Sequence, residues 1–188
     1  MFGRPSDFLA NCSLTRPRIC AEPVIVDVAG EASVSVMVDT LLSRWGGVDI
    51  LVNDAGFESS KAVLDIGLEE YERVMRVNTT GVWLRCRAVI PVMLRRQSGC
   101  IVNVGSVAGQ RGGGLPGTAA YSTSKGAAIA LTKALGREFA KSGIRVNAVS
   151  LSLTMAVGRM PFRAPEARKP PSTGMAMPVT YAAASEAR

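Results

Sequence analysis

The sequence predicts an α/β fold in which a parallel β-sheet is covered by helices on both faces. Two features of the pattern predict it. Short apolar runs rich in β-branched residues recur along the chain, and longer segments of helical periodicity alternate with them. A third is size, because 188 residues, of which 47% are hydrophobic, suit one domain with a buried core. The alternation requires crossover connections between parallel strands, and these are almost always right-handed.

Four short runs are predicted to be strands. They are VIVDV at 24–28, VDILVND at 48–54, CIVNV at 100–104 and IRVNAV at 144–149. Each is rich in apolar residues, as expected for strands that are buried on both faces of a parallel sheet. Ligands bind such sheets beyond the carboxyl ends of the strands, so the residues that follow each run are the first candidates for a site.

Three segments have the period of an amphipathic helix. They span 31–45, 68–96 and 119–142. The second has glutamates in its first turn and arginines in its last, which suits the helix dipole. Gly81 and Pro91 predict a kink or a break within it. The glycine-rich stretch at 109–117 is predicted to be a flexible loop.

The two ends of the chain differ in composition from the middle. Residues 1–23 contain three prolines and no clear period, which predicts an irregular segment. Residues 155–188 are rich in proline, arginine, alanine and methionine without a period, which predicts a disordered tail. The folded domain is therefore expected over 24–154.

Composition excludes several classes of function. Histidine is absent, which removes Ser-His-Asp and Cys-His catalysis and histidine-ligated zinc, and the four cysteines lack C-x-x-C spacing, so no metal site is expected. The net charge of +7 comes without a dense basic run that contains aromatic residues, so nucleic-acid binding is not expected. Without an apolar run of membrane-spanning length or a secretory leader, the prediction is a cytoplasmic protein with reduced thiols and no membrane association.

Tyr121 and Lys125 open the third predicted helix and lie four residues apart, on one helix face. An ammonium beside a phenol favours the phenolate and lowers the tyrosine pKa, so the pair can exchange a proton with a carbonyl or alcohol oxygen. The competing interpretation is a half-buried tyrosine beside a solvated lysine.

Two further polar residues lie in suggestive places. Ser106 follows the strand at 100–104, where its hydroxyl could polarise a substrate oxygen or cap an ordinary turn. Asn78 lies inside a predicted helix, where asparagine is a poor helix former. It is either a surface polar residue or the site of a break in helical bonding. Such a break would free a carbonyl to hold a water that links Lys125 to solvent.

Four motifs, VDILVNDAG, VNTTG, IVNVGSVAG and YSTSK, occur in this order, and over about residues 24–150 the chain resembles the short-chain dehydrogenase/reductases. The resemblance implies a Rossmann-like, doubly wound sheet and hydride transfer between NAD or NADP and a small alcohol or ketone. It implies a catalytic set of Ser106, Tyr121, Lys125 and Asn78, in which Tyr121 is the general acid/base and Lys125 also binds the nicotinamide ribose.

The same resemblance implies the remaining cofactor contacts. Asp27 and Val28 match the pair that flanks the adenine. Asp54, Ala55 and Gly56 fall in the family's Asn-Asn-Ala-Gly turn beside the adenosine ribose, with aspartate in place of the second asparagine. The glycine-rich stretch at 109–117 would be a loop on the substrate side.

Departures from the family pattern define a second hypothesis. The glycine-rich turn that faces the cofactor diphosphate, the first two strands and the last strand have no counterpart that we recognise in the sequence. We therefore expect an incomplete sheet and weak cofactor binding, and the choice between NAD and NADP stays open. The alternative function is a catalytically impaired remnant that acts through association with itself or with an intact relative.

Assembly and sheet pairing complete the expectations. The resemblance implies a homo-oligomer, at least a dimer, that packs through the helices at 68–96 and 119–142. The face expected on the second of these helices consists of Ala120, Ala127, Ala128, Leu131 and Leu135. With two family strands absent between them, 24–28 is expected to pair directly with 48–54, because unpaired buried backbone groups are costly.

Overall fold

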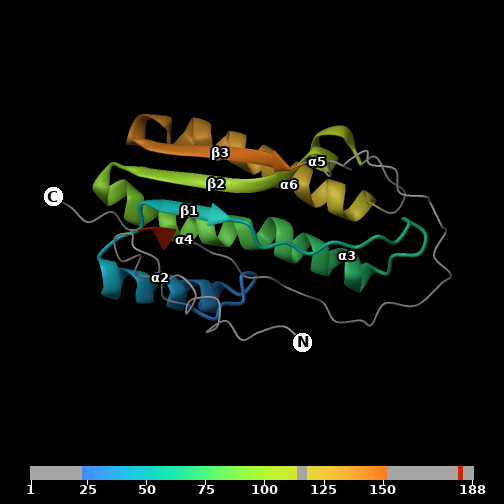
Figure 1. The fold of residues 1–188 in the computed structure, drawn as a ribbon, viewed down its shortest axis with the longest axis horizontal. Coiled ribbons are helices and arrows are strands. Elements are labelled where there is room, and N and C mark those ends of the chain that lie inside the picture. The colour runs from blue at the N-terminus through green and yellow to red at the C-terminus, as the bar shows by residue number, and fades with distance from the viewer. Residues whose placement is uncertain (1–22, 114–117, 152–181, 184–188) are drawn as a thin grey trace, which may run out of the picture.

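The structure is a computed structural model that describes residues 23–113, 118–151 and 182–183. Its main elements are three parallel strands and three long helices (Figure 1). The irregular segment predicted at 1–23 and the tail predicted at 155–188 lie almost wholly outside the described residues.

The sheet has the strand order β3-β2-β1-β4. Strands β1 (Ile50–Asn53), β2 (Gly99–Ser106) and β3 (Ile144–Leu151) are parallel, with Leu51 paired to Ile101 and Ser106 to Leu151. These are the strands predicted at 48–54, 100–104 and 144–149. Parallel strands with helical crossovers give the Rossmann-like α/β architecture that the sequence predicts.

The strand predicted at 24–28 does not form, and its expected pairing with VDILVND is wrong. These residues lie in no strand, although Val24 and Val26 still pack against the core while Ile25 is fully exposed. The free edge of β1 instead pairs with the two-residue strand β4 (Ala182–Ala183), which runs antiparallel. Backbone pairing at this edge is thus provided by a segment that lies more than a hundred residues further along the chain.

Three helices form one layer against the sheet. They are α2 (Glu31–Trp45), α4 (Gly81–Arg96) and α6 (Ala119–Glu138). The core between them and the sheet includes Val34, Met37, Val38, Leu41, Leu51, Val89, Ile90, Met93, Ile101 and Ile144. Pro91 lies inside α4 on its exposed side without ending the helix. Gly81 is required at the start of α4, because a Cβ atom there would lie 2.8 Å from the carbonyl oxygen of Val28.

The long helix predicted at 68–96 is continuous in direction but changes its hydrogen bonding. It consists of α3 (Leu68–Met75), the π-helical turn η1 (Arg76–Thr80) and α4. The irregularity that the sequence predicts at Gly81 and Pro91 therefore falls one turn earlier, around Asn78. π-Helical turns of this kind commonly occur at functional sites.

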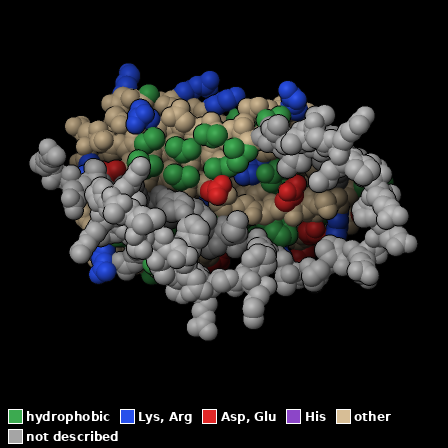
Figure 2. Space-filling view, in the orientation of Figure 1, with side chains coloured by type: hydrophobic (Ala, Val, Ile, Leu, Met, Phe, Trp, Pro, Cys, Tyr) green, Lys and Arg blue, Asp and Glu red, His purple; other side chains and the backbone are tan. Residues whose placement is uncertain are grey.

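The described helices cover only one face of the sheet. Asn53 and Asn103 are buried on that face, where they bond to α4 and α6 respectively. Residues of the opposite parity point to the other face, where Ile50, Val149 and Leu151 keep between 39% and 57% of their surface exposed. Figure 2 shows hydrophobic side chains gathered on this front face. The second helical layer that the sequence predicts has no counterpart among the described residues.

Two short elements flank the third helix. The helix α5 (Val107–Arg111) occupies the start of the stretch predicted as a glycine-rich loop, and Gly112 and Gly113 follow it with positive φ angles. Residues 114–117 lie outside the described part. After α6, the 3₁₀ turn η2 (Ala140–Ser142) leads through Gly143 into β3.

The association face expected on α6 is partly buried within the chain, and its use between copies stays a prediction. Ala120 and Ala128 are buried within the chain, and Leu131 and Leu135 pack against its own core. Part of the apolar stripe of α6 therefore packs within one copy of the chain, while Ala127, Leu131 and Leu135 keep some exposed surface.

Candidate functional site

Lys125 projects from the second turn of α6 into a nearly closed environment. Its side chain is 5% exposed, and its Nζ donates a hydrogen bond of 2.7 Å to the Val104 carbonyl in β2. The Nζ atom lies 5.8 Å from the centre of the Tyr121 ring. Burial lowers the pKa of Lys125, whereas the carboxylate of Asp54 raises it. The predicted pair is thus assembled on one helix face, with the ammonium held against the end of β2.

Ser106 joins this pair from the carboxyl end of β2. It caps α5, and its Oγ accepts a hydrogen bond of 3.1 Å from the Ala108 amide. Burial raises the pKa of Tyr121, while a hydrogen bond with the Ser106 side chain lowers it and Glu58 raises it further. The net direction is opposite to the expected lowering by Lys125. Burial thus favours the protonated phenol of Tyr121, and Ser106 lies beside its hydroxyl.

Asn78 is the structural centre of the site. It is 1% exposed, so the interpretation as a surface residue is wrong. Its Oδ1 accepts from the Phe57 amide at 2.7 Å, and its Nδ2 donates to the Phe57 carbonyl at 2.8 Å and to Ser124 Oγ at 2.9 Å. Ser124 in turn donates to the Tyr121 carbonyl at 2.7 Å. The π-helical turn thus connects the segment after β1 to the first turn of α6.

The turn after β1 reaches the same place. A Cβ atom on Gly56 would lie 3.5 Å from Asn78 Oδ1 and 3.7 Å from Lys125 Nζ. Ala55 is buried, and Asp54 is exposed but close enough to influence the pKa of Lys125. The structure therefore brings the Asp54–Gly56 turn against the predicted catalytic residues, at the carboxyl edge of the sheet.

Asp27 and Val28 belong to a different part of this edge. Asp27 is exposed, and its Oδ1 accepts from the Ala29 amide at 3.0 Å in a tight turn before α2. Val28 is buried, with its carbonyl against Gly81. No described contact links either residue to Tyr121 or Lys125.

A buried polar network, which sequence reasoning missed, runs beneath the site. Arg85 Nε donates to Asn53 Oδ1 at 2.6 Å, Asn53 Nδ2 donates to Asn103 Oδ1 at 2.8 Å, and Asn103 Nδ2 donates to Thr132 Oγ1 at 2.8 Å. Two features of the sequence could have indicated this network. Asn53 and Asn103 are polar residues at inward positions of apolar strands, and Arg85 is a charged residue on the apolar face of α4. The network joins β1 and β2 to the helices on either side of the site.

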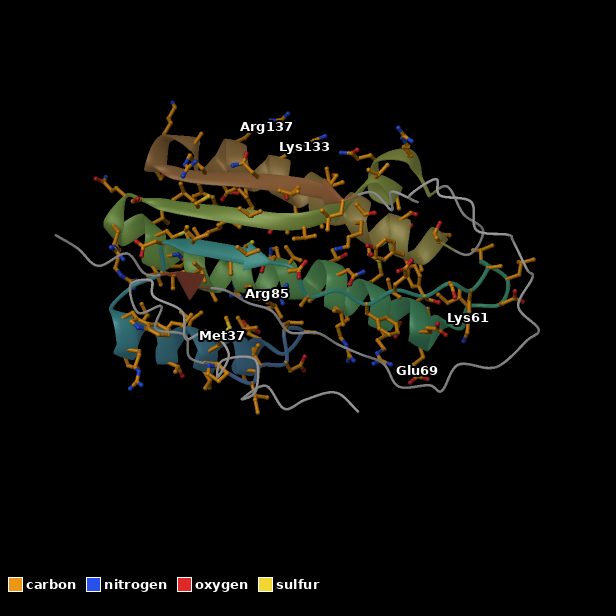
Figure 3. All side chains as sticks on the ribbon, viewed as in Figure 1. Met37, Lys61, Glu69, Arg85, Lys133 and Arg137 are labelled. Carbon is orange, nitrogen blue, oxygen red and sulfur yellow. The ribbon has the colours of Figure 1, made fainter. Side chains whose placement is uncertain are left out.

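Other features of the described residues lie elsewhere or are absent. A hollow of about 410 Å³ lies between α6 and β3 and is lined by Lys133 and Arg137 among others (Figure 3). It does not include Tyr121 or Lys125. Within residues 23–113, 118–151 and 182–183, no cluster of three metal-ligating side chains occurs. None of the helices described there has the length and apolar character required to cross a membrane.

Comparison with known proteins agrees with this geometry. A model of the short chain dehydrogenase family matches residues 10–166. The chain is 44% identical to 2-(R)-hydroxypropyl-CoM dehydrogenase of Xanthobacter autotrophicus, across 67% of this chain and 51% of that protein. It is 39% identical to 3-oxoacyl-[acyl-carrier-protein] reductase of Synechocystis, across 68% of this chain and 51% of the relative.

A solved structure gives the same result for the fold. The crystal structure of NAD+-bound xylitol dehydrogenase is 38% identical and superposes with a TM-score of 0.65, covering 69% of this chain and 49% of that one. The chain spans about half the length of the relatives that it matches. With four motifs placed around one site and a family match over most of its length, the chain belongs to the short-chain dehydrogenase family.

Proposed function

We propose that this chain acts in an NAD- or NADP-dependent oxidoreductase that interconverts a small alcohol and a ketone. The observation that carries the proposal is the convergence of Ser106, Tyr121, Lys125 and Asn78 at the carboxyl edge of the sheet. The names of the relatives, dehydrogenases and a reductase, support the same reaction class.

The described residues fit the nicotinamide end of such a cofactor. A lysine ammonium has three donors, and the described hydrogen bond to Val104 uses one of them. Gly56 lacks a side chain beside this ammonium, which leaves room for ribose hydroxyls. The similarity to NAD+-bound xylitol dehydrogenase supports a cofactor of this kind. When bound, the cofactor would supply or accept the hydride.

The chain's own residues would handle the proton. Ser106 donates a hydrogen bond to the substrate oxygen and orients it, and Tyr121 transfers its hydroxyl proton to that oxygen when a ketone is reduced. Lys125 stabilises the phenolate that this step produces. Asn78 acts as a positioning residue, since its hydrogen bonds hold the Phe57 segment and, through Ser124, the first turn of α6.

A second function is supported by the uncovered sheet face. Ile50 in β1 and Val149 and Leu151 in β3 are each exposed on that face. This favours association with another copy or with an intact relative, as in the hypothesis of an impaired remnant. We also propose a reducing, cytoplasmic location, which is supported by Cys86 because it is a buried free thiol.

The test of the oxidoreductase proposal is turnover of a panel of secondary alcohols with NAD+ or NADP+, followed by absorbance of the reduced nicotinamide. We expect Tyr121→Phe to lower the rate by about 10²–10⁴-fold, the range for loss of a general acid. Tyr71→Phe, which removes a hydroxyl from α3, is the matched control and should retain the parent rate. A Tyr121→Phe variant within twofold of the parent would contradict the proposed proton transfer.

A further inference from the structure

Glu58 is an exposed carboxylate in a segment that is fixed on both sides. The amide and the carbonyl of Phe57, the residue before it, both bond to the buried side chain of Asn78, at 2.7 and 2.8 Å. Ser59, the residue after it, is 4% exposed, and its Oγ donates to the Glu70 carboxylate at 2.6 Å. Because both neighbours are held, the side chain of Glu58 starts from a defined place.

That place is next to the first turn of α6. Asn78 also donates to Ser124 Oγ at 2.9 Å, and Ser124 donates to the Tyr121 carbonyl at 2.7 Å. Two side chains therefore connect the segment that carries Glu58 to the residue that carries the phenol. The negative charge of Glu58 raises the pKa of Tyr121, which agrees with a position close to the phenol.

The site has a second carboxylate, and the two act on different groups. Among the groups that shift the pKa of Lys125, the carboxylate is that of Asp54 and not that of Glu58. Asp54 thus lies on the Lys125 side of the site, and Glu58 lies on the Tyr121 side. Since Lys125 is the residue proposed to bind the nicotinamide ribose, the carboxylate of Glu58 faces the place of the substrate.

The cations next to Glu58 in the sequence do not neutralise it. Lys61 pairs with Glu70 and lies within its hydrogen-bond reach. The guanidinium of Arg73 lies over the Phe57 ring, 4.3 Å from its centre. Within the part of the chain that the structure describes, the Glu58 carboxylate forms no ion pair and accepts no hydrogen bond. Its charge is therefore available to a ligand.

We propose that Glu58 is a specificity-determining residue and that the alcohol or ketone taken by this site carries a cationic group such as an ammonium. The inference rests on the proposed function and names its substrate class. A cationic substrate gains an attraction to the uncompensated carboxylate, whereas a substrate with a carboxylate or phosphate is repelled. Because Tyr121 is only partly buried and Glu58 is exposed, a substrate whose oxygen meets the phenol can extend toward the carboxylate.

The test compares three small secondary alcohols in oxidation by NAD+ or NADP+. They are isopropanolamine, a cation at neutral pH, sec-butanol, which is neutral, and β-hydroxybutyrate, an anion. We expect the parent to have the highest kcat/KM for isopropanolamine and the lowest for β-hydroxybutyrate. Glu58→Gln should lower the ratio of these two values by about 3- to 20-fold, because one attraction and one repulsion between partly exposed charges are lost. Glu58→Lys should invert the order, and added salt should reduce the ratio of the parent.

The ratio isolates selection by charge, since a change in the acidity of Tyr121 acts on all three alcohols alike. The matched control is Glu69→Gln, which removes the same charge from the first turn of α3 (Figure 3) and should keep the ratio of the parent. A parent that does not prefer isopropanolamine to β-hydroxybutyrate would overturn the proposal. An equal ratio in the parent and in Glu58→Gln would do so as well.

Absorbance of tyrosinate at alkaline pH gives a readout that needs no turnover. The chain has three tyrosines, so the titration of Tyr121 is taken as the difference between a protein and its Tyr121→Phe variant. Glu58→Gln should move this titration to lower pH, because it removes the charge that opposes the phenolate. An unchanged titration would overturn the proposal, since the carboxylate would then not lie beside the phenol.

The two proposals fail in different ways. A shifted Tyr121 titration with no turnover of any alcohol would sustain the position of Glu58 and contradict the oxidoreductase. Turnover of sec-butanol, with a charge preference that does not depend on Glu58, would do the reverse.

Discussion

Replacing Asn78 by alanine should destabilise the domain more than any other single polar truncation at the site. The side chain makes three hydrogen bonds of 2.7–2.9 Å and is 1% exposed, so water cannot replace them. At about 1 kcal/mol net for each neutral bond, the loss is about 3 kcal/mol. Alanine is the better helix former by up to about 0.7 kcal/mol, which leaves a net loss of about 2–3 kcal/mol.

The assay is urea denaturation followed by circular dichroism, with thermal melting as a second measurement. For a domain of this size the expected loss lowers the melting temperature by roughly 5–10 °C. Asn147→Ala, which truncates an exposed asparagine on β3, is the control and should change stability by less than about 0.5 kcal/mol. The same small change for Asn78→Ala would refute the assignment of its hydrogen bonds.

The variant Asn78→Asp separates hydrogen bonding from lost volume. A carboxylate keeps the shape and can accept from the Phe57 amide, but it cannot donate to the Phe57 carbonyl, which the amide bonds at 2.8 Å. Two acceptors would then face each other in a buried place, so we expect a loss of stability at neutral pH at least as large as that for alanine. Equal stability of Asn78→Asp and the parent at pH 7 would mean that the π-helical turn does not hold the Phe57 segment.

Three other predictions concern glycine packing, pH and assembly. Gly81→Ala should cost about 1–3 kcal/mol in urea unfolding, because the new Cβ would lie 2.8 Å from the Val28 carbonyl oxygen. Gly136→Ala, with 3.4 Å of clearance in α6, should be neutral or stabilising, and equal losses would contradict the packing. Burial raises the pKa of Tyr121 in the fold. The stabilisation by the buried, protonated phenol is therefore complete below the pKa of about 10 in the unfolded chain, and it is lost as pH rises through the pKa in the folded chain. In melting experiments at different pH values, Tyr121→Phe should flatten this alkaline decline. Light scattering at tens of micromolar should show a dimer, and a monomer would count against association through the uncovered sheet face.

Local patterns predicted much of the fold. The apolar runs at 48–54, 100–104 and 144–149 became the three parallel strands, and the periodic segment at 31–45 became α2 with the same limits. Such patterns suffice because burial of one helix face or of a strand depends on the periodicity of nearby residues. The spacing of Tyr121 and Lys125 placed both on one face of α6 for the same reason.

The pairing of VIVDV could not be predicted in this way. Its alternation still directs Val24 and Val26 inward, but the edge of β1 pairs with Ala182 and Ala183 instead. Pairing depends on which backbone reaches the edge, and any extended segment presents the same amide and carbonyl groups. The same limit applies to the α6 stripe, whose apolar residues fit a subunit contact or a core equally well.

The sequence by itself determined the strand and helix segments around the site and the order of Ser106, Tyr121 and Lys125, because these follow from local periodicity and from short motifs. Only the tertiary structure decided the partners. It placed Asn78 between Phe57 and Ser124, raised the pKa of Tyr121 by burial, and enclosed Arg85 with two unpaired donors. Desolvation and hydrogen-bond pairing are set by residues distant in sequence, so they emerge only when the strands and helices pack together.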